Sequence, residues 1–185
     1  MHLSLGTMVI GDQLDQAKSE ALLAAWQATG EREVDTAFLY PAVQLEGKTE
    51  SMLGAMALPA DVAISSKANA WTKGRLTRES VLAQGRGSLE RLRVKQLDIF
   101  YLHMPDHASD QLETLSAVQE LFKEGVFQRF GLSNFAAWQV VEVCQFLALG
   151  CFVCSSQQDL FHDAVARMGA SHSGAVHLQC AEPRH

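Results

Sequence analysis

Polar side chains stand at unexpected places in three apolar stretches of the chain. Asp35 lies within EVDTAFLYP (residues 33–41), and the apolar part of that stretch ends on Tyr40. Lys67 ends the stretch ADVAISSK, and His103 follows QLDIFYL. Strands of a parallel sheet are buried on both faces and should be apolar, so these four side chains indicate a site rather than a core.

A carboxylate, a phenol, an ammonium and an imidazole together suit the reduction of a carbonyl group. A phenol with a pKa of about 10 is a weak proton donor, and an ammonium such as Lys67 within roughly 4–6 Å would lower the pKa of Tyr40. Asp35 would keep Lys67 charged and oriented, and His103 would hydrogen-bond the substrate carbonyl. None of these side chains supplies a hydride, so the chemistry requires a nicotinamide cofactor.

The nicotinamide would be bound differently from the dinucleotides of doubly wound folds. The first strand-like stretch, LGTMVIG, lacks the GxGxxG fingerprint of those folds. Ser133 and Asn134 end a later stretch, FQRFGLSN, and carry a hydroxyl and an amide that can bind a carboxamide. We therefore expect the nicotinamide to lie at these two residues.

The elements that must position these residues alternate between strands and helices at intervals of roughly 30 residues. Parallel neighbours need a crossover, which a helix supplies, so the pattern predicts a parallel sheet. Side chains at the carboxyl ends of its strands meet at one edge. Strands are expected at 5–11, 32–40, 60–69, 96–106 and 127–134, and helices at 16–30, 48–58, 77–93, 109–125 and 135–150.

Two of these helices carry specific expectations. Gly85 and Gly87 weaken the third, because each glycine costs about 1 kcal/mol against alanine in a helix interior. The fifth is expected to begin with Asn134 as its cap and to turn Trp138 and Leu147 inward.

Two architectures fit five strand–helix pairs. Length favours an open doubly wound sheet, since an eight-unit barrel typically needs about 250 residues.

Composition limits the function classes. The chain has 185 residues, of which 48% are hydrophobic and 19% charged, as in a globular protein. A net charge of −6 and a pI near 5.6 argue against nucleic-acid and membrane partners. No apolar run approaches the length of about 20 residues that a membrane span needs, and the N-terminus lacks a signal-peptide pattern, so a cytoplasmic location is expected.

Five motifs carry a specific resemblance. LGTM, DTAFLY, SSKAN, DIFYLHMPD and GLSNFAAW occur in this order over about residues 3–149. Together they resemble the aldo-keto reductase family, and most closely its branch of aflatoxin-aldehyde and succinic-semialdehyde reductases. Members of the family fold as (β/α)₈ TIM barrels. The resemblance therefore implies, against the length argument, that this α/β chain forms a partial barrel of the first five units.

The resemblance also implies a reaction, NADPH-dependent reduction of a small-molecule aldehyde to an alcohol, and a homodimer, which is frequent in the branch. The position of the family's proton donor matches Tyr40, and the rest of its catalytic tetrad matches Asp35, Lys67 and His103. The cofactor contacts of the family match Ser133, Asn134, Asp35 and Met8.

The sequence departs from the family pattern at two places. The stretch PAVQLEGKTE (residues 41–50) is about four residues longer than the family's loop. No family motif follows Cys151, so we expect a partial barrel at 1–150 and a divergent, poorly ordered tail at 151–185. The tail contains two ligand-like pairs, but the 17 residues between the pairs exceed the usual zinc-finger spacing, and no metal site is assigned. These pairs are Cys151 with Cys154 and His172 with His177.

An alternative function follows from the same departures. The chain would then be a truncated, catalytically inactive family member, either without function or acting only through protein–protein association at its open sheet.

Overall fold

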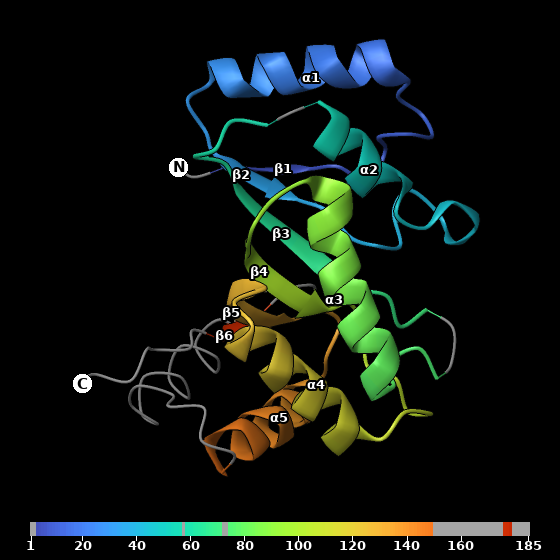
Figure 1. The fold of residues 1–185 in the computed structure, drawn as a ribbon, viewed down its shortest axis with the longest axis vertical. Coiled ribbons are helices and arrows are strands. Elements are labelled where there is room, and N and C mark those ends of the chain that lie inside the picture. The colour runs from blue at the N-terminus through green and yellow to red at the C-terminus, as the bar shows by residue number, and fades with distance from the viewer. Residues whose placement is uncertain (1–2, 57, 72–73, 150–175, 179–185) are drawn as a thin grey trace.

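The computed structural model describes residues 3–56, 58–71, 74–149 and 176–178 (Figure 1). Its strands are β1 (Ser4–Gly6), β2 (Glu33–Asp35), β3 (Ala63–Ala68), β4 (Leu97–Leu102), β5 (Phe127–Leu132) and β6 (Val176–Leu178). Its helices are α1 (Gln16–Ala28), α2 (Lys48–Ala55), α3 (Arg78–Leu92), α4 (Gln111–Lys123) and α5 (Ala137–Leu149), with a short 3₁₀ helix at Val43–Leu45.

The strands lie in one sheet in the order in which they follow one another along the chain. Strands β1 to β5 are all parallel, and β6 pairs with β5 in the antiparallel direction. Figure 1 shows the helices following one another along the sheet from α1 to α5. A doubly wound sheet of flavodoxin type would have β1 between β2 and β3. The sequential order is that of a (β/α)₈ barrel, so the open-sheet alternative suggested by length is wrong.

The core lies between the sheet and the helices. Phe100 on β4 stacks on Phe127 of β5 at 5.6 Å between ring centroids, and both side chains are fully buried. Helices α3 and α4 pack against each other, and a Cβ atom on Gly85 would lie 2.6 Å from Cδ1 of Leu121. The third helix therefore forms as predicted, and its glycine provides the space for close packing against α4.

A buried carboxylate links helix α2 to strand β3 and helix α3. The side chain of Glu50 on α2 is fully buried. Its Oε1 accepts a hydrogen bond of 2.5 Å from the Ser66 hydroxyl on β3, and its Oε2 accepts one of 2.6 Å from Nε of Arg91 on α3. Beside this network, a Cβ atom on Gly54 would lie 2.1 Å from the Arg91 carbonyl oxygen. The second and third units are thus joined by polar contacts as well as by apolar packing.

The structure corrects several sequence-based expectations. Strand β2 ends at Asp35 and is therefore shorter than the strand expected at 32–40, and Tyr40 lies in the loop that follows it. Trp138 does not face inward, since it is 60% exposed, whereas Leu147 is buried as predicted. Asn134 has a φ of 61° and directs its amide to other loops, so the expectation that it caps α5 is wrong.

The expectations for the C-terminal part fall largely outside the described residues. These are the tail at 151–185 and the pairing of Cys151, Cys154 and His172. Strand β6, which contains His177, was not predicted. The division at residue 150 stays a prediction. Within the described residues, no helix combines the length and the apolar character that crossing a membrane requires.

Candidate active site

The site is built around a buried lysine. Lys67 lies near the end of β3 and is only 6% exposed. Its Nζ lies 2.7 Å from each carboxylate oxygen of Asp35 on β2 and 2.7 Å from the Thr36 carbonyl oxygen. An ammonium has three protons, so these acceptors satisfy it. Burial lowers the pKa of Lys67, while the charge and hydrogen bonds of Asp35 oppose the shift.

The ring of Tyr40 covers this ammonium. Nζ of Lys67 lies 5.3 Å from the centroid of the Tyr40 ring. After β2 the chain still runs beside β3 as far as Phe38, whose N–H donates to the Lys67 carbonyl oxygen at 3.1 Å. The chain then turns, with the Tyr40 N–H donating to the Ala37 carbonyl oxygen at 3.1 Å. This turn brings the phenol back over the edge of the sheet.

His103 completes the group from β4. Its ring meets the ring of Tyr40 edge-on, with 5.7 Å between centroids and an interplanar angle of 81°. The backbone N–H of His103 donates to the Ala68 carbonyl oxygen at 3.1 Å, which holds the end of β4 against the end of β3. The four residues predicted to form a site, here called the tetrad, therefore lie together at the carboxyl edge of the sheet.

Electrostatics at the site differ from the expectation. Burial raises the pKa of Tyr40 to about 12, and the negative charge of Asp35 adds to the rise. The expected lowering of this pKa by Lys67 is wrong for this structure. The reason is geometric, because the ammonium protons point to Asp35 and Thr36 and the charge is largely offset by the carboxylate. Tyr40 therefore keeps its proton firmly at neutral pH.

The imidazole is also neutral at neutral pH. Burial, and then the positive charge of Lys67, lower the pKa of His103 to about 4 against the opposing effect of Asp35. Nδ1 of His103 is buried without a hydrogen-bond partner among the described residues. The site thus presents two neutral hydrogen-bonding groups, Tyr40 and His103, above a buried cation.

The residues expected to bind the nicotinamide lie beside His103. Nδ2 of Asn134 donates to the His103 carbonyl oxygen at 2.8 Å and to the Ser133 hydroxyl at 3.1 Å. Asn134 is exposed and Ser133 half-buried, so both are accessible at the sheet edge. Met8, in the turn after β1, is 58% exposed. A carboxamide could be held at the first two residues, next to the imidazole.

Comparisons with known proteins show the family of the chain. The sequence model of the aldo/keto reductase family matches residues 2–158. The chain belongs to this family. Human aflatoxin B1 aldehyde reductase member 2 is 43% identical over 145 residues, which are 76% of this chain and 39% of that protein. Human aldo-keto reductase family 7 member A3 is 36% identical over 168 residues, 88% of this chain and 50% of that protein.

A solved family structure agrees with the fold. A thermostable aldo-keto reductase in complex with the inhibitor epalrestat is 28% identical and superposes with a TM-score of 0.68 over 77% of this chain and 53% of that chain. The chain thus spans about half, or less, of the length of the relatives it matches. The predicted partial barrel and the predicted family branch are both confirmed.

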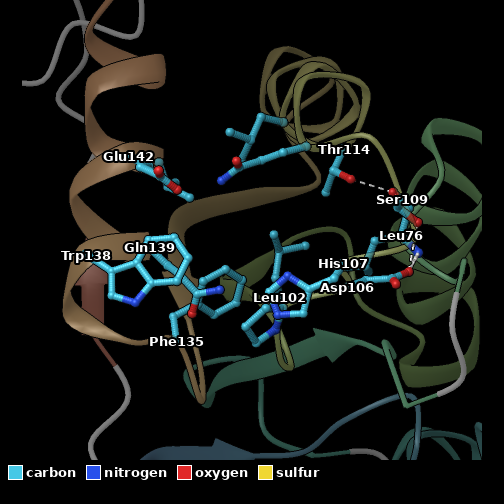
Figure 2. A pocket seen from close by; sticks show the side chains of 14 residues that line it. Leu76, Leu102, Asp106, His107, Ser109, Thr114, Phe135, Trp138, Gln139 and Glu142 are labelled. Atoms are coloured by element: carbon cyan, nitrogen blue, oxygen red, sulfur yellow. Dashed lines mark hydrogen bonds between the residues drawn. The ribbon is translucent and has the colours of Figure 1, made fainter.

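A separate pocket is lined by residues of the loops after β3 and β4 and of helices α4 and α5 (Figure 2). Its volume is about 230 Å³, and its described lining residues do not include any member of the tetrad. Leu102, the last residue of β4, lines it, whereas the next residue, His103, belongs to the tetrad. Trp138, Glu142 and Asp106 are among the other lining residues. This pocket is therefore distinct from the tetrad.

Asp106 fixes one wall of that pocket. Its carboxylate accepts hydrogen bonds from the Leu76 N–H at 3.1 Å and the Ser109 hydroxyl at 2.7 Å. Burial alone would raise the pKa of Asp106, but these bonds and one from the Ala108 N–H outweigh it and hold the pKa at about 2. The loops after β3 and β4 are joined by this ionised side chain.

Hydrogen bonds also hold the loop at residues 41–50, which is expected from the sequence to be longer than the family's. Glu46, in this loop, accepts hydrogen bonds from Nδ2 of Asn69 at 2.5 Å and from Nη2 of Arg75 at 2.7 Å. Asn69 is fully buried, and its Oδ1 accepts from the Trp71 N–H at 2.7 Å. The loop carrying Tyr40 is thus connected to the loop after β3.

Sequence reasoning missed two residues of the site. Tyr101 on β4 also faces Lys67, with Nζ 5.6 Å from its ring centroid. Gly131 lies opposite Tyr101 on β5. The alternation of a strand could have found Tyr101, because residues two apart share a face and His103 was already assigned to the site.

Proposed function

We propose that this chain carries the catalytic edge of an NADPH-dependent aldo-keto reductase that reduces small-molecule aldehydes to alcohols. The observation that carries the proposal is the stacking of groups at one edge of the sheet. A buried ammonium, Lys67, is held by Asp35 and lies under the ring of Tyr40, which in turn meets His103. Membership of the family supports the same reaction class.

Each residue has a separate part in the proposed reaction. Tyr40 and His103 are both neutral at neutral pH and both can hydrogen-bond the oxygen of an aldehyde between them. When bound, NADPH would supply the hydride that no side chain here can supply. As negative charge develops on the substrate oxygen, it becomes more basic than a phenolate, and the Tyr40 proton can transfer to it.

Lys67 acts on the phenolate that this transfer leaves. A pKa of about 12 means that Tyr40 does not ionise before the substrate oxygen becomes strongly basic. The Lys67 ammonium, 5.3 Å from the ring centroid, then offsets part of the cost that burial and Asp35 impose on the phenolate. Asp35 keeps that cation charged and in place. The ammonium therefore stabilises a charge that appears only during the reaction.

For the cofactor, Ser133 and Asn134 would hold the carboxamide, with Asp35 and Met8 in the further contacts that the resemblance implies. In (β/α)₈ enzymes phosphate groups usually bind at the loops after strands seven and eight. The described residues offer the nicotinamide end of such a site. We therefore expect the 185-residue chain to bind NADPH weakly, which a fluorescence titration would measure. Tight binding by a monomer would contradict this expectation.

The test of the reaction is the loss of NADPH absorbance in the presence of a panel of aliphatic and aromatic aldehydes. Tyr40→Phe removes the hydroxyl group, and with it the transferable proton, and should abolish turnover. Circular dichroism should show an unchanged fold. Phe38→Leu, two residues earlier in the same loop, is the matched control and should retain turnover. Undiminished turnover by Tyr40→Phe would rule out the proposed role of Tyr40.

We also propose, from composition and resemblance alone, a cytoplasmic homodimer without nucleic-acid or membrane partners. Light scattering of the purified protein measures the assembly state, and fractionation of the source cells measures the location.

A further inference from the structure

The ammonium of Lys67 lies close to two phenol rings. Its Nζ is 5.3 Å from the ring centroid of Tyr40 and 5.6 Å from that of Tyr101. Lys67 and Tyr101 are direct partners in the register of β3 and β4. Tyr101 is only 3% exposed. A cation within about 6 Å of a ring centroid is attracted by the negative face of the ring.

Gly131 provides the space for the second ring. It is the register partner of Tyr101 on β5. A Cβ atom on Gly131 would lie 2.3 Å from both Cδ1 and Cε1 of Tyr101, a contact that a ring cannot tolerate. Gly131 is not among the glycines with positive φ, so its backbone would accept other residues. Glycine is therefore required at position 131 because the ring of Tyr101 occupies the space of a Cβ atom.

We propose that Tyr101 is a positioning residue, which holds the Lys67 ammonium under Tyr40 through the face of its ring, and that Gly131 keeps the place of that ring. The three hydrogen bonds of Nζ all point toward β2. Among the described residues, the ammonium has no ion-pair partner on β4, and the ring of Tyr101 on that strand supplies a negative face. The catalytic meaning of this contact rests on the proposed function.

The other groups around Lys67 are accounted for. Asp35 and the Thr36 carbonyl face it from β2, Tyr40 from the following loop, and His103 from β4. Burial, and then the charge of Asp35, raise the pKa of Tyr101 far above its usual value. Arg129 opposes this rise, while Asp98 and Glu33 add to it. Tyr101 therefore acts as a neutral ring and not as a second charge.

The test changes the face of the ring without changing its size. Tyr101 is replaced by phenylalanine and by its trifluoro and pentafluoro derivatives, which progressively remove the negative face. The pKa of Lys67 is followed by carbon-13 NMR of the lysine Cε atoms, with the Lys67 signal assigned by its loss in Lys67→Met. We expect the pKa to change little with phenylalanine and to fall by about one unit with the pentafluoro ring.

The direction of the change separates two explanations. A ring that only fills space and excludes water would give the same pKa through the whole series. In Tyr101→Leu, such a role would admit water and raise the pKa of Lys67, whereas our proposal predicts a fall. Phe100→Leu, which removes a ring from the opposite face of β4, is the matched control and should leave the Lys67 pKa unchanged.

Gly131→Ala gives a second route to the same contact, because it displaces the ring of Tyr101 without removing it. We expect a lower Lys67 pKa in this variant too. A constant pKa across the fluorinated series and in Gly131→Ala would overturn the proposal. The titration requires no turnover, so the Lys67 pKa can be measured even in an inactive protein. An inactive protein would contradict the proposed function without deciding the role of Tyr101. In an active protein, the pentafluoro variant should shift the alkaline limb of the kcat profile and leave KM unchanged.

Discussion

Replacing Asp35 by asparagine should destabilise the fold most at neutral pH. The carboxylate supplies two of the three acceptors of the Lys67 ammonium, which is almost fully buried. Removing one partner of a fully buried ion pair costs about 3–5 kcal/mol. The Asp35 side chain is 38% exposed, and asparagine keeps one acceptor oxygen, so solvent screening reduces the expected loss to about 2 kcal/mol.

The sign of the pH dependence follows from the pKa of Lys67. Burial already lowers this pKa below its ordinary value of 10.5, so the charged lysine costs stability below the folded pKa. That cost disappears as pH rises from the folded pKa toward the unfolded value. Without Asp35 the folded pKa falls further. Asp35→Asn should therefore lose about 2 kcal/mol near pH 7 and much less near pH 10.5.

The assay is urea unfolding followed by far-UV circular dichroism at the two pH values. Asp61→Asn is the matched control, because Asp61 pairs with Arg32 at an exposed position and should lose less than about 1 kcal/mol at either pH. In a Lys67→Met background, Asp35→Asn should cost little, since no ammonium remains to be satisfied. An equal loss at both pH values would refute the reasoning.

Three further changes test other parts of the structure. Gly54→Ala should lower the melting temperature strongly and cost more than about 2 kcal/mol, because the added Cβ would lie 2.1 Å from the Arg91 carbonyl oxygen; an unchanged melting curve would contradict the packing described. Lys67→Met should reduce the reductase rate most below the lowered pKa of Lys67 and least above it; a loss independent of pH would point to a folding role. His103, with its pKa lowered to about 4, should make the wild type lose about 2–3 kcal/mol as pH falls from 6.5 to 4, and His103→Gln should flatten this dependence in acid unfolding curves.

The tetrad could be predicted because its signal is local. A polar residue at the end of an apolar strand is visible in the sequence, and parallel strands bring such ends together whatever the details of packing. The motifs around Asp35, Lys67 and His103 then fixed the family. The same patterns predicted all five helices, including the one with two glycines, because helix periodicity outweighs the intrinsic cost of Gly85 at a close helix contact.

The predictions that were wrong concern properties that depend on the environment of a side chain rather than on its type. Trp138 was expected to be buried because its side chain is large and apolar. It lies instead in the first turn of α5, where it lines a pocket. The pKa of Tyr40 was expected to fall because a lysine was near. Burial and the charge of Asp35 win instead, and neither quantity can be read from spacing along the chain.

The bonds of Glu46 have a consequence for any exchange of loops between this protein and its relatives. Asn69 is fully buried, and Glu46 is the acceptor for its amide group. A shorter loop grafted after Tyr40 would remove that acceptor, and a buried amide without a partner costs about 1–3 kcal/mol. The conformations of these two loops are therefore coupled, and an exchange of the loop after Tyr40 would have to be accompanied by a matching change in the loop after β3.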